Sequence, residues 1–455
     1  MAILPNTIQA LPGVNIKGAF ASPITGVSID TRSLNAGDLF VAFNGSQVDG
    51  HDFIPKAISR GASAVMASTS WDGCELWEAP IPLILTDDPV KTLADLATAH
   101  RKRFSIPLIA VTGTNGKTST KNLLAHLLSK RFVVHTTDGN LNNHIGLPMT
   151  ILNMYESHEV SVIEMGASQQ GDIKYLCDIA QPTQGLITNI SLAHTEFFHD
   201  VETIQQTKGE LFRYLCAHSG RSFVNADDPR VKELAVDCPN PVHFSFLKPS
   251  EYFYTTDGPD NHGCYTLHLE GYRAHLPQPG KILALNAAAA ATIALQNGVP
   301  YDQIKEALES YEGEKGRMEQ VNINSVIFYN DAYNANPAST KAGFETIADI
   351  KASGRKLLIF ADMLELGEES ISLHLDAAKQ MLASGFDQIF LVGEAVEVIA
   401  QHFENQESTS FYYNPDKARV IEYFLSQVTS GDLVYLKGSR SMTLETFIDA
   451  YKEVS

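Results

Sequence analysis

A glycine-containing segment of the chain carries the clearest chemical signal. Residues 111–119 read Val-Thr-Gly-Thr-Asn-Gly-Lys-Thr-Ser, between an apolar strand-like run and an amphipathic helical stretch. Glycines let a backbone wrap so that its N–H groups point at phosphate oxygens, and the N-terminus of the following helix adds partial positive charge. Lys117 is then expected to reach the β- and γ-phosphates of a nucleotide, and the Thr118 hydroxyl to ligate Mg²⁺. The candidate nucleotide-binding residues are Thr112, Gly113, Thr114, Asn115, Gly116, Lys117, Thr118 and Ser119.

One position departs from the usual phosphate-loop pattern G-x-x-x-x-G-K-[ST]. Val111 stands where the first glycine normally lies. A chance match in an ordinary loop is the alternative interpretation. The strand before the segment and the helix after it favour nucleotide binding.

An acidic residue ends the apolar run over residues 160–163. Glu164 is the only ionisable group between residues 160 and 166. The carboxyl ends of parallel strands form the ligand-binding edge of a sheet, so Glu164 is predicted to face Thr118 as a second Mg²⁺ ligand. A charge solvated at the end of a strand is the alternative, which the nearby phosphate loop disfavours.

Two further residues carry weaker signals. His194 follows the strand-like run 186–190, and Lys208 comes fourteen residues later in a helical stretch. A lone histidine after a strand is more often structural than catalytic, and a lone lysine on a helix is usually a solvated charge. Neither residue alone indicates a site.

Short apolar runs alternate with helix-period segments along the chain, which is typical of parallel sheets covered by helices. A length of 455 residues predicts about three domains. We place three α/β domains at residues 1–102, 103–312 and 313–455, the second a phosphate-loop ATPase-type domain with a parallel sheet and the third Rossmann-like. Within the second domain, residues 240–280 are predicted to form a small antiparallel patch, followed by an alanine-rich helix over 285–295.

Composition and charge exclude several classes of function. The chain has 34 Lys and Arg against 53 Asp and Glu, a formal net charge of −19, which disfavours nucleic-acid binding unless the surface has a local basic groove. No apolar stretch approaches the length of a membrane span, and the first residues lack the pattern of a signal peptide. We therefore expect a cytoplasmic protein that binds neither nucleic acid nor membrane.

The five cysteines are scattered and never spaced as C-x-x-C. This pattern argues against a disulfide framework and against a structural zinc site. Each cysteine is expected to be a buried, unreactive thiol in a reducing compartment.

Together these motifs resemble the Mur ligase family, ATP-dependent enzymes that add amino acids to the UDP-muramoyl peptide of the cell-wall precursor. The family's phosphate loop is T-G-T-x-G-K-[ST] without the first glycine, which fits Val111. The family's central acid, metal-site histidine and helix lysine match Glu164, His194 and Lys208.

Within the family, the chain resembles the ligases that join D-alanyl-D-alanine to UDP-N-acetylmuramoyl-tripeptide. The matching segments are residues 28–32 and 37–42, which look like a UDP-sugar-binding front domain, and residues 139–148, 331–337, 362–367 and 437–441. The MurE-type ligases of the family typically have His-Thr where this chain has Ala335 and Asn336.

The resemblance implies an acyl-phosphate mechanism with ATP and two Mg²⁺ ions. Lys117 and a first Mg²⁺ on Thr118 and Glu164 would offset phosphate charge, and a second Mg²⁺ would lie near His194. In related ligases the lysine equivalent to Lys208 carries a carbamate that supports the second metal. An unmodified Lys208 that bonds a phosphate or Glu210 is the alternative.

The resemblance also implies binding roles for residues outside the phosphate loop. Asn286, Arg317 and Asp331 are expected at the nucleotide, although Asn286 could instead be a helix N-cap. The residues expected at the UDP-sugar-peptide and the dipeptide are Ser28, Asp30, Thr31, Arg32, Asn140, Asn142, Asn143, Asn336 and Arg440. An asparagine-rich loop can also simply cap its own turns. The resemblance further implies a monomer that acts on small-molecule substrates.

Three competing functions stay open. One is another ligase of the same mechanism, MurE-like or similar to folylpolyglutamate synthase, although the latter generally lacks the front domain. A second is a phosphate-loop kinase or ATPase, which would not need the segment 331–337. A third is a catalytically inactive nucleotide-binding scaffold, which the intact set Lys117, Thr118, Glu164, His194 and Lys208 disfavours.

Overall fold

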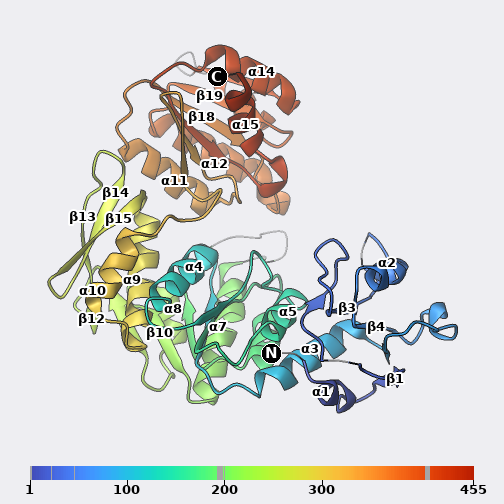
Figure 1. The fold of residues 1–455 in the computed structure, drawn as a ribbon. Coiled ribbons are helices and arrows are strands. Elements are labelled where there is room, and N and C mark those ends of the chain that lie inside the picture. The colour runs from blue at the N-terminus through green and yellow to red at the C-terminus, as the bar shows by residue number, and fades with distance from the viewer. Residues whose placement is uncertain are drawn as a thin grey trace.

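The chain forms three α/β domains that follow one another in the sequence (Figure 1). The structure is a computed structural model, and it describes residues 3–21, 23–45, 47–191, 198, 200–404 and 410–454. The N-terminal domain packs beside the middle domain, and the third domain lies across from both (Figure 1). No described helix has the length and apolar character needed to cross a bilayer.

The N-terminal domain contains a five-stranded sheet of order β1-β5-β4-β3-β2. Only β1 runs antiparallel to its neighbour. The strands and helices are β1 (Asn15–Lys17), β2 (Val27–Ser28), β3 (Leu39–Val41), β4 (Ala64–Ser68), β5 (Leu83–Thr86), α1 (Pro5–Gln9), α2 (Ile54–Ser59) and α3 (Pro89–Arg101). The apolar residues of β3 to β5 are buried, as expected for parallel strands covered on both faces.

The middle domain is built on a seven-stranded parallel sheet of order β12-β11-β10-β9-β6-β8-β7. Its strands are β6 (Leu108–Thr112), β7 (Val134–Thr136), β8 (Val160–Glu164), β9 (Gln184–Ile187), β10 (Arg221–Asn225), β11 (Val242–Ser245) and β12 (Tyr252–Phe253). Its helices are α4 (Lys117–Leu128), α5 (Gly146–Leu152), α6 (Asp172–Ala180), α7 (Val201–Ala217), α8 (Pro229–Leu234), α9 (Lys281–Gln296) and α10 (Tyr301–Glu309). Because β6 lies between β8 and β9, the carboxyl ends of these three strands meet at one place on the sheet edge.

The predicted antiparallel patch is smaller than expected. A three-stranded antiparallel sheet holds β13 (Thr255–Asp257), β14 (Cys264–Leu269) and β15 (Tyr272–Pro279), and β11 and β12 instead extend the parallel sheet. The expectation of an antiparallel patch from residue 240 is therefore wrong for residues 242–253. Their aromatic and polar residues resemble an antiparallel strand because they lie toward the sheet edge, where burial on both faces is incomplete.

The third domain carries a six-stranded sheet of order β16-β17-β21-β18-β19-β20, parallel except for β16. Its strands are β16 (Glu319–Ile323), β17 (Val326–Asn330), β18 (Lys356–Ala361), β19 (Gln388–Val392), β20 (Phe411–Asn414) and β21 (Leu433–Lys437). Its helices are α11 (Pro337–Asp349), α12 (Ser370–Ala383), α13 (Glu397–Phe403), α14 (Lys417–Gln427) and α15 (Glu445–Val454). The domain boundaries at residues 102 and 312 stay predictions.

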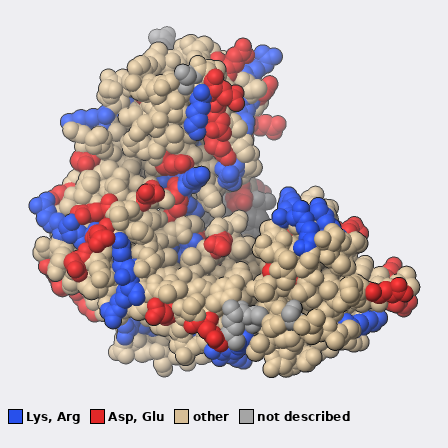
Figure 2. Space-filling view, in the orientation of Figure 1, with Lys and Arg blue, Asp and Glu red and all other residues tan. Residues whose placement is uncertain are grey.

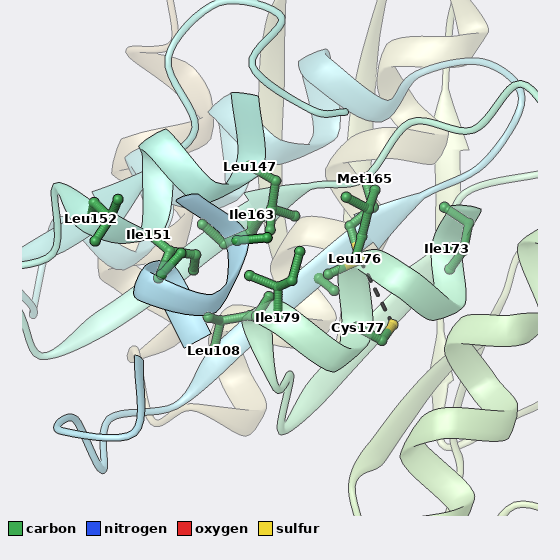
Figure 3. Packing of buried hydrophobic residues seen from close by; sticks show 14 of the residues in the cluster. Leu108, Leu147, Ile151, Leu152, Ile163, Met165, Ile173, Leu176, Cys177 and Ile179 are labelled. Carbon is green, nitrogen blue, oxygen red and sulfur yellow. Dashed lines mark hydrogen bonds between the residues drawn. The ribbon is translucent and has the colours of Figure 1, made fainter. Parts of the chain in front are cut away.

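The N-terminal and middle domains share one hydrophobic core. Leu93 and Leu96 of α3 belong to the same buried cluster as residues of α5 and α6. Figure 3 shows the middle-domain part of this cluster, in which Leu147 and Ile151 of α5 lie near Ile163 and Ile179. The helix that ends the first domain therefore fixes that domain against the phosphate-loop sheet.

The cysteine expectation is wrong at three positions. Cys216, in the last turn of α7, and Cys238, after α8, form a disulfide, and Cys74 is only half-buried. Cys177 and Cys264 are free and buried, as expected. The packing of α8 against α7 brings Cys216 and Cys238 together, and the spacing of the two residues in the sequence does not reveal that contact.

Leu124→Ala is expected to lower the free energy of unfolding by about 2–5 kcal/mol, because it leaves a cavity in a close-packed core. Leu124 lies on α4 with no exposed surface and packs in a cluster with the alanines of α9. Guanidinium unfolding measures the change. The matched control Leu247→Ala, at a side chain that is 75% exposed, should change the same quantity by less than about 0.5 kcal/mol. Equal effects at both positions would contradict this packing.

Candidate active site

A cavity of about 1020 Å³ opens where the middle and third domains face each other. In the space-filling view the surface is hollowed on the side where the third domain stands across from the N-terminal domain (Figure 2). Most of the predicted site residues line this cavity. They are Gly113, Thr114, Asn115, Gly116, Lys117, Thr118, Ser119, Asn140, Asn142, Asn143, Glu164, Lys208, Asn286, Arg317, Asp331 and Asn336.

The phosphate loop joins the end of β6 to the start of α4. Gly113 and Gly116 both have positive φ, of 143° and 78°, and an added Cβ at Gly113 would collide with the Thr188 hydroxyl. Only glycine suits these positions, so the two residues fix the path of the loop. Lys117 Nζ donates to the carbonyls of Gly113 and Thr114, each at 3.0 Å, and so lies folded against its own loop. Burial lowers the pKa of Lys117, while the charge of Glu164 acts in the opposite direction.

The next strand in the sheet positions Glu164. Glu164 pairs in register with Val111, so it stands beside the start of the phosphate loop. The side chain is only 2% exposed; Oε1 accepts from Asn142 Nδ2 at 2.7 Å, whereas Oε2 is buried and bonds to no described residue. A buried carboxylate oxygen without a partner is costly. Glu164 and Thr118 both line the cavity, and carboxylate and hydroxyl oxygens are the kind of ligand that a hard divalent cation such as Mg²⁺ takes.

Lys208 lies on α7 and is 4% exposed. Burial, reinforced by the charge of Lys117, lowers the pKa of Lys208 to about 7, although Asp172, Glu210 and Glu164 act against that shift. No hydrogen bond joins Lys208 to Glu210; the two Glu210 oxygens accept from the backbone N–H groups of Gly171 and Lys174 at the start of α6. Lys208 is thus a buried amine that is largely uncharged slightly above neutral pH.

Residues after β9 hold the tip of the phosphate loop. Asn189 Oδ1 accepts from the backbone N–H of Asn115 at 3.2 Å, and Thr188 Oγ1 donates to the Asn115 carbonyl at 2.6 Å. Thr112 has no exposed surface and donates from Oγ1 to the carbonyl of Met165, so it braces the loop from behind the cavity. His194 follows in the same connection, but it lies outside the described residues.

The third domain already touches the phosphate loop. Arg317 Nη2 donates to Thr118 Oγ1 at 3.1 Å, and the Arg317 guanidinium stacks on the Tyr333 ring at 4.1 Å. Asn336 Nδ2 donates to Asn115 Oδ1 at 2.7 Å. Arg317 and Asn336 therefore contact the phosphate loop directly.

Asp331 lines the cavity with its carboxylate already paired. Oδ2 accepts from Lys437 Nζ at 2.7 Å and from the Tyr435 hydroxyl at 2.9 Å. Burial and this carboxylate raise the pKa of Tyr435. The interactions join the end of β17 to β21 and fix the start of the segment 331–337.

Asn286 is not an N-cap. The N-cap of α9 is Gly280, so Asn286 lies in the second turn of the helix, nearly buried, and lines the cavity. Its amide lies so close to Gly116 that a Cβ there would come within 2.8 Å of Oδ1. The N-cap alternative is wrong because the helix begins four residues before the alanine-rich segment used to place it.

Five other predicted residues lie outside the lining of this cavity. Arg440 is exposed and pairs with Glu445 at 2.7 Å. Ser28, Asp30, Thr31 and Arg32 lie together at the end of β2 in the N-terminal domain, where Asp30 and Arg32 form an ion pair. The guanidinium of Arg60 donates to the carbonyls of Thr31 and Arg32. Figure 2 shows Lys and Arg side chains gathered on the N-terminal domain beside the hollow.

Two residues near the phosphate loop were missed by the sequence analysis; Glu314 lines the cavity and Lys121 does not. Glu314 accepts from Ser119 Oγ at 2.9 Å and also from the Tyr311 hydroxyl, so it links α4 to the entry of the third domain. Lys121 is 2% exposed and donates to the Thr137 carbonyl, while Thr137 Oγ1 accepts from the backbone N–H of Glu164. The sequence signal for Lys121 was its helical spacing, which places a lysine on the same face as Leu124 and Leu128. No sequence signal pointed to Glu314.

Comparison with family models covers nearly the whole chain. Residues 23–101 match the model described as "Mur ligase family, catalytic domain", residues 111–294 match "Mur ligase middle domain", and residues 316–440 match "Mur ligase, glutamate ligase domain". The order of the three matches follows the order of the three domains.

Individual proteins give a similar result. The chain is 30% identical over 451 residues to the UDP-N-acetylmuramoyl-tripeptide--D-alanyl-D-alanine ligase of Bacillus subtilis (strain 168), covering 95% of each chain. It resembles a crystal structure of MurF from Acinetobacter baumannii with a TM-score of 0.84 and 27% identity, over 95% of this chain and 94% of the other. It also resembles the MurF ligase of Thermotoga maritima in complex with ADP, with a TM-score of 0.81 and 28% identity, over 94% and 97%.

Lys208→Met is expected to stabilise the protein against unfolding at neutral pH. The pKa of Lys208 is about 7 in the folded chain and near its ordinary 10.5 when unfolded, so below pH 10.5 the unfolded state binds the proton more readily. The native lysine therefore lowers the free energy of unfolding. The loss is complete below about pH 7 and shrinks as the pH rises toward 10.5. The gain at pH 7 has an upper bound of about 5 kcal/mol.

Guanidinium unfolding in CO₂-free buffer at pH 7 and pH 10 measures this gain, which should be larger at pH 7. The control Lys305→Met, on a side chain that is 43% exposed, should show a change below about 0.5 kcal/mol. A Lys208→Met protein no more stable than the native chain at pH 7 would contradict the burial of this amine.

Proposed function

The chain belongs to the Mur ligase family, and we propose that it is an ATP-dependent ligase that joins D-alanyl-D-alanine to UDP-N-acetylmuramoyl-tripeptide. The observation that carries the proposal is similarity along 95% of both chains to a ligase with that named activity. The phosphate loop, Glu164 and Lys208 around one cavity support it. The product is the UDP-N-acetylmuramoyl-pentapeptide of peptidoglycan synthesis.

Amide formation from a carboxylate needs activation, because oxide is a poor leaving group. In the proposed reaction a carboxylate oxygen of the tripeptide attacks the γ-phosphorus of ATP, which breaks the bond to ADP and forms an acyl phosphate. The amine of the dipeptide then attacks the carbonyl carbon, phosphate leaves with the C–O electron pair, and the amine loses a proton.

The first step brings negative charges together. Two unit charges 4 Å apart repel by about 4 kcal/mol at an effective dielectric of 20. On the chain, Lys117 and the N-terminus of α4 offset the phosphate charge. Lys117 bonds its own loop carbonyls in the free protein, and we propose that it exchanges these for phosphate oxygens when ATP binds.

Thr118 and Glu164 are proposed to hold Mg²⁺ at the phosphates. Oε2 of Glu164, which is buried and has no hydrogen-bond partner within the described part of the chain, supports this assignment. The ion would supply positive charge where negative charge develops on the γ-phosphate. Arg317 donates to Thr118 Oγ1 in this structure, so we propose that it moves from the hydroxyl onto a phosphate as the hydroxyl becomes a ligand.

Lys208 is proposed to carry a carbamate. With a pKa of about 7, a large fraction of the amine is neutral at physiological pH and able to attack CO₂. The N–C bond forms, the nitrogen releases a proton, and the neutral buried amine becomes an anion that attracts Lys117. That anion, together with His194, would support a second Mg²⁺.

The N-terminal domain is proposed to hold the UDP end of the substrate. Arg32 and Arg60 lie together at the end of β2, and the charge of Lys56 acts on the neighbouring Asp30. Guanidinium and ammonium groups suit a diphosphate. Asn140, Asn142 and Asn143 line the cavity that holds the phosphate loop, which suits contact with the sugar-peptide, and Asn336 and Arg440 are the proposed dipeptide contacts.

Phosphate release should require all three substrates together. With ATP, UDP-N-acetylmuramoyl-tripeptide and D-alanyl-D-alanine, the rate should fall at least 100-fold when any one is omitted, because the acyl phosphate turns over only when the amine attacks it. Release that does not depend on the dipeptide would contradict the proposal and favour a kinase or ATPase. Release that instead needs a single amino acid and the muramoyl peptide one residue shorter than the tripeptide would favour a MurE-like ligase.

Lys208→Ala should lose activity and regain part of it in short-chain carboxylic acids. Removal of the amine removes the carbamate, and a small carboxylate can occupy the vacated space. We expect a loss of at least 100-fold, with at least tenfold recovery in millimolar acetate or formate. The control Lys305→Ala should keep native activity with or without the acid. Absence of recovery, with native-like circular dichroism, would count against the carbamate.

A further inference from the structure

A second group of potential metal ligands lies on the small antiparallel sheet, outside the lining of the cavity between the middle and third domains (the ATP cavity). Asp260 and Cys264 flank the loop that leads into β14, and His275 lies on β15. One carboxylate oxygen, the Cys264 sulfur and one ring nitrogen of His275 lie within 4.8 Å of one another. None of the three residues lines the cavity between the domains.

The loop holds Asp260 and Cys264 in fixed positions. The backbone N–H of Asp260 donates to the Cys264 carbonyl at 2.9 Å, and the N–H of Gly263 donates to the Asp260 carbonyl at 3.0 Å. Asp260 Oδ1 accepts from the N–H groups of His262 and Cys264. Oδ2 is left to face His275 Nε2, 4.0 Å away.

The third ligand comes from the strand that pairs with β14. His275 stands opposite Thr266 in the register of β14 and β15, and an irregularity in pairing between Cys264 and Thr266 precedes that point. The imidazole is half exposed and Cys264 is buried, so the group forms a shallow site with the sulfur at its base. Ligands on a paired hairpin are positioned by backbone hydrogen bonds before any ion arrives.

We propose that Asp260, Cys264 and His275 form a binding site for Zn²⁺ or a cation of similar chemistry. One thiolate, one imidazole and one carboxylate are a zinc-type donor set, and water completes a tetrahedron. Tetrahedral Zn²⁺ with bonds of about 2.0 Å to nitrogen and oxygen holds those atoms roughly 3.3 Å apart. The 4.0 Å separation of Oδ2 and Nε2 therefore needs a movement of less than 1 Å by two partly exposed side chains.

Binding replaces the thiol proton by the metal. Burial raises the pKa of the Cys264 thiol to about 11, so the free chain carries the thiol. The metal–sulfur bond forms as the S–H proton passes to solvent, and no electrons are exchanged.

The site lies where the middle and third domains touch. The backbone N–H of Lys351 donates to the Asn261 carbonyl at 3.0 Å, and a Cβ on Gly263 would lie 2.8 Å from the side chain of Ile350. Ile350 and Lys351 directly follow α11, and the first residue of α11, Pro337, is the last residue of the segment 331–337. A metal on the 260–264 loop would stiffen this contact between the domains.

Co²⁺ provides a spectroscopic test on the full chain. After treatment with a chelator and its removal, addition of Co²⁺ alone should give a thiolate-to-cobalt charge-transfer band in the near ultraviolet and strong visible bands of a tetrahedral ion. Both should saturate near one equivalent and vanish when Zn²⁺ is added. The oxygen ligands proposed at Thr118 and Glu164 cannot give the thiolate band.

Matched variants locate the signal. Cys264→Ser should abolish the charge-transfer band, and His275→Gln should weaken Co²⁺ binding at least tenfold. The control Cys74→Ser, at a half-buried cysteine outside the group, should behave as the native chain. No band in the native chain, or a band that survives in Cys264→Ser, would overturn the proposal. Should Cys264→Ser fail to fold, His275→Gln decides, because His275 is half exposed: native affinity in that variant would also overturn it.

Discussion

The order of strands in the middle sheet is the constraint on which the site depends. β6 and β8 are parallel neighbours, and Val111 pairs in register with Glu164. The phosphate loop after β6 and the carboxylate at the end of β8 therefore lie side by side. A carboxylate next to a phosphate site is repulsive unless a cation stands between them. The sheet thus creates an electrostatic repulsion when a nucleotide phosphate binds, and a divalent ion would relieve it.

Several groups at the site are in energetically unfavourable environments in the free protein. Glu164 Oε2 is buried and bonds to no residue that the structure describes, Lys208 is a buried amine with a lowered pKa, and Lys117 donates to carbonyls of its own loop. Each of these buried groups lowers the free energy of unfolding of the free chain. The environment of each group becomes favourable when a group of opposite charge binds beside it. The shared core of α3, α5 and α6, together with the α4–α9 packing, supplies the rigidity that keeps such groups in place.

Local patterns allowed much of the fold and site to be predicted. The glycines and Lys117 form one continuous segment, and the chemistry of Glu164 follows from its place at the end of an apolar run. Contacts between distant segments could not be predicted. Glu314 reaches Ser119 across 195 positions, and Arg317 reaches Thr118 across 199. The Cys216–Cys238 disulfide and the parallel pairing of β11 likewise depend on how helices and strands pack, which no spacing rule reveals.

The most direct test of the account is the position of a divalent ion in the ATP cavity. Crystals soaked with a non-hydrolysable ATP analogue and Mn²⁺ would locate the ion by its anomalous scattering. The account predicts one manganese at ligand distance from Thr118 Oγ1 and Glu164 Oε2, with the Arg317 guanidinium displaced from the hydroxyl. Bound nucleotide with no ion there, and with Glu164 Oε2 still without a partner, would contradict it.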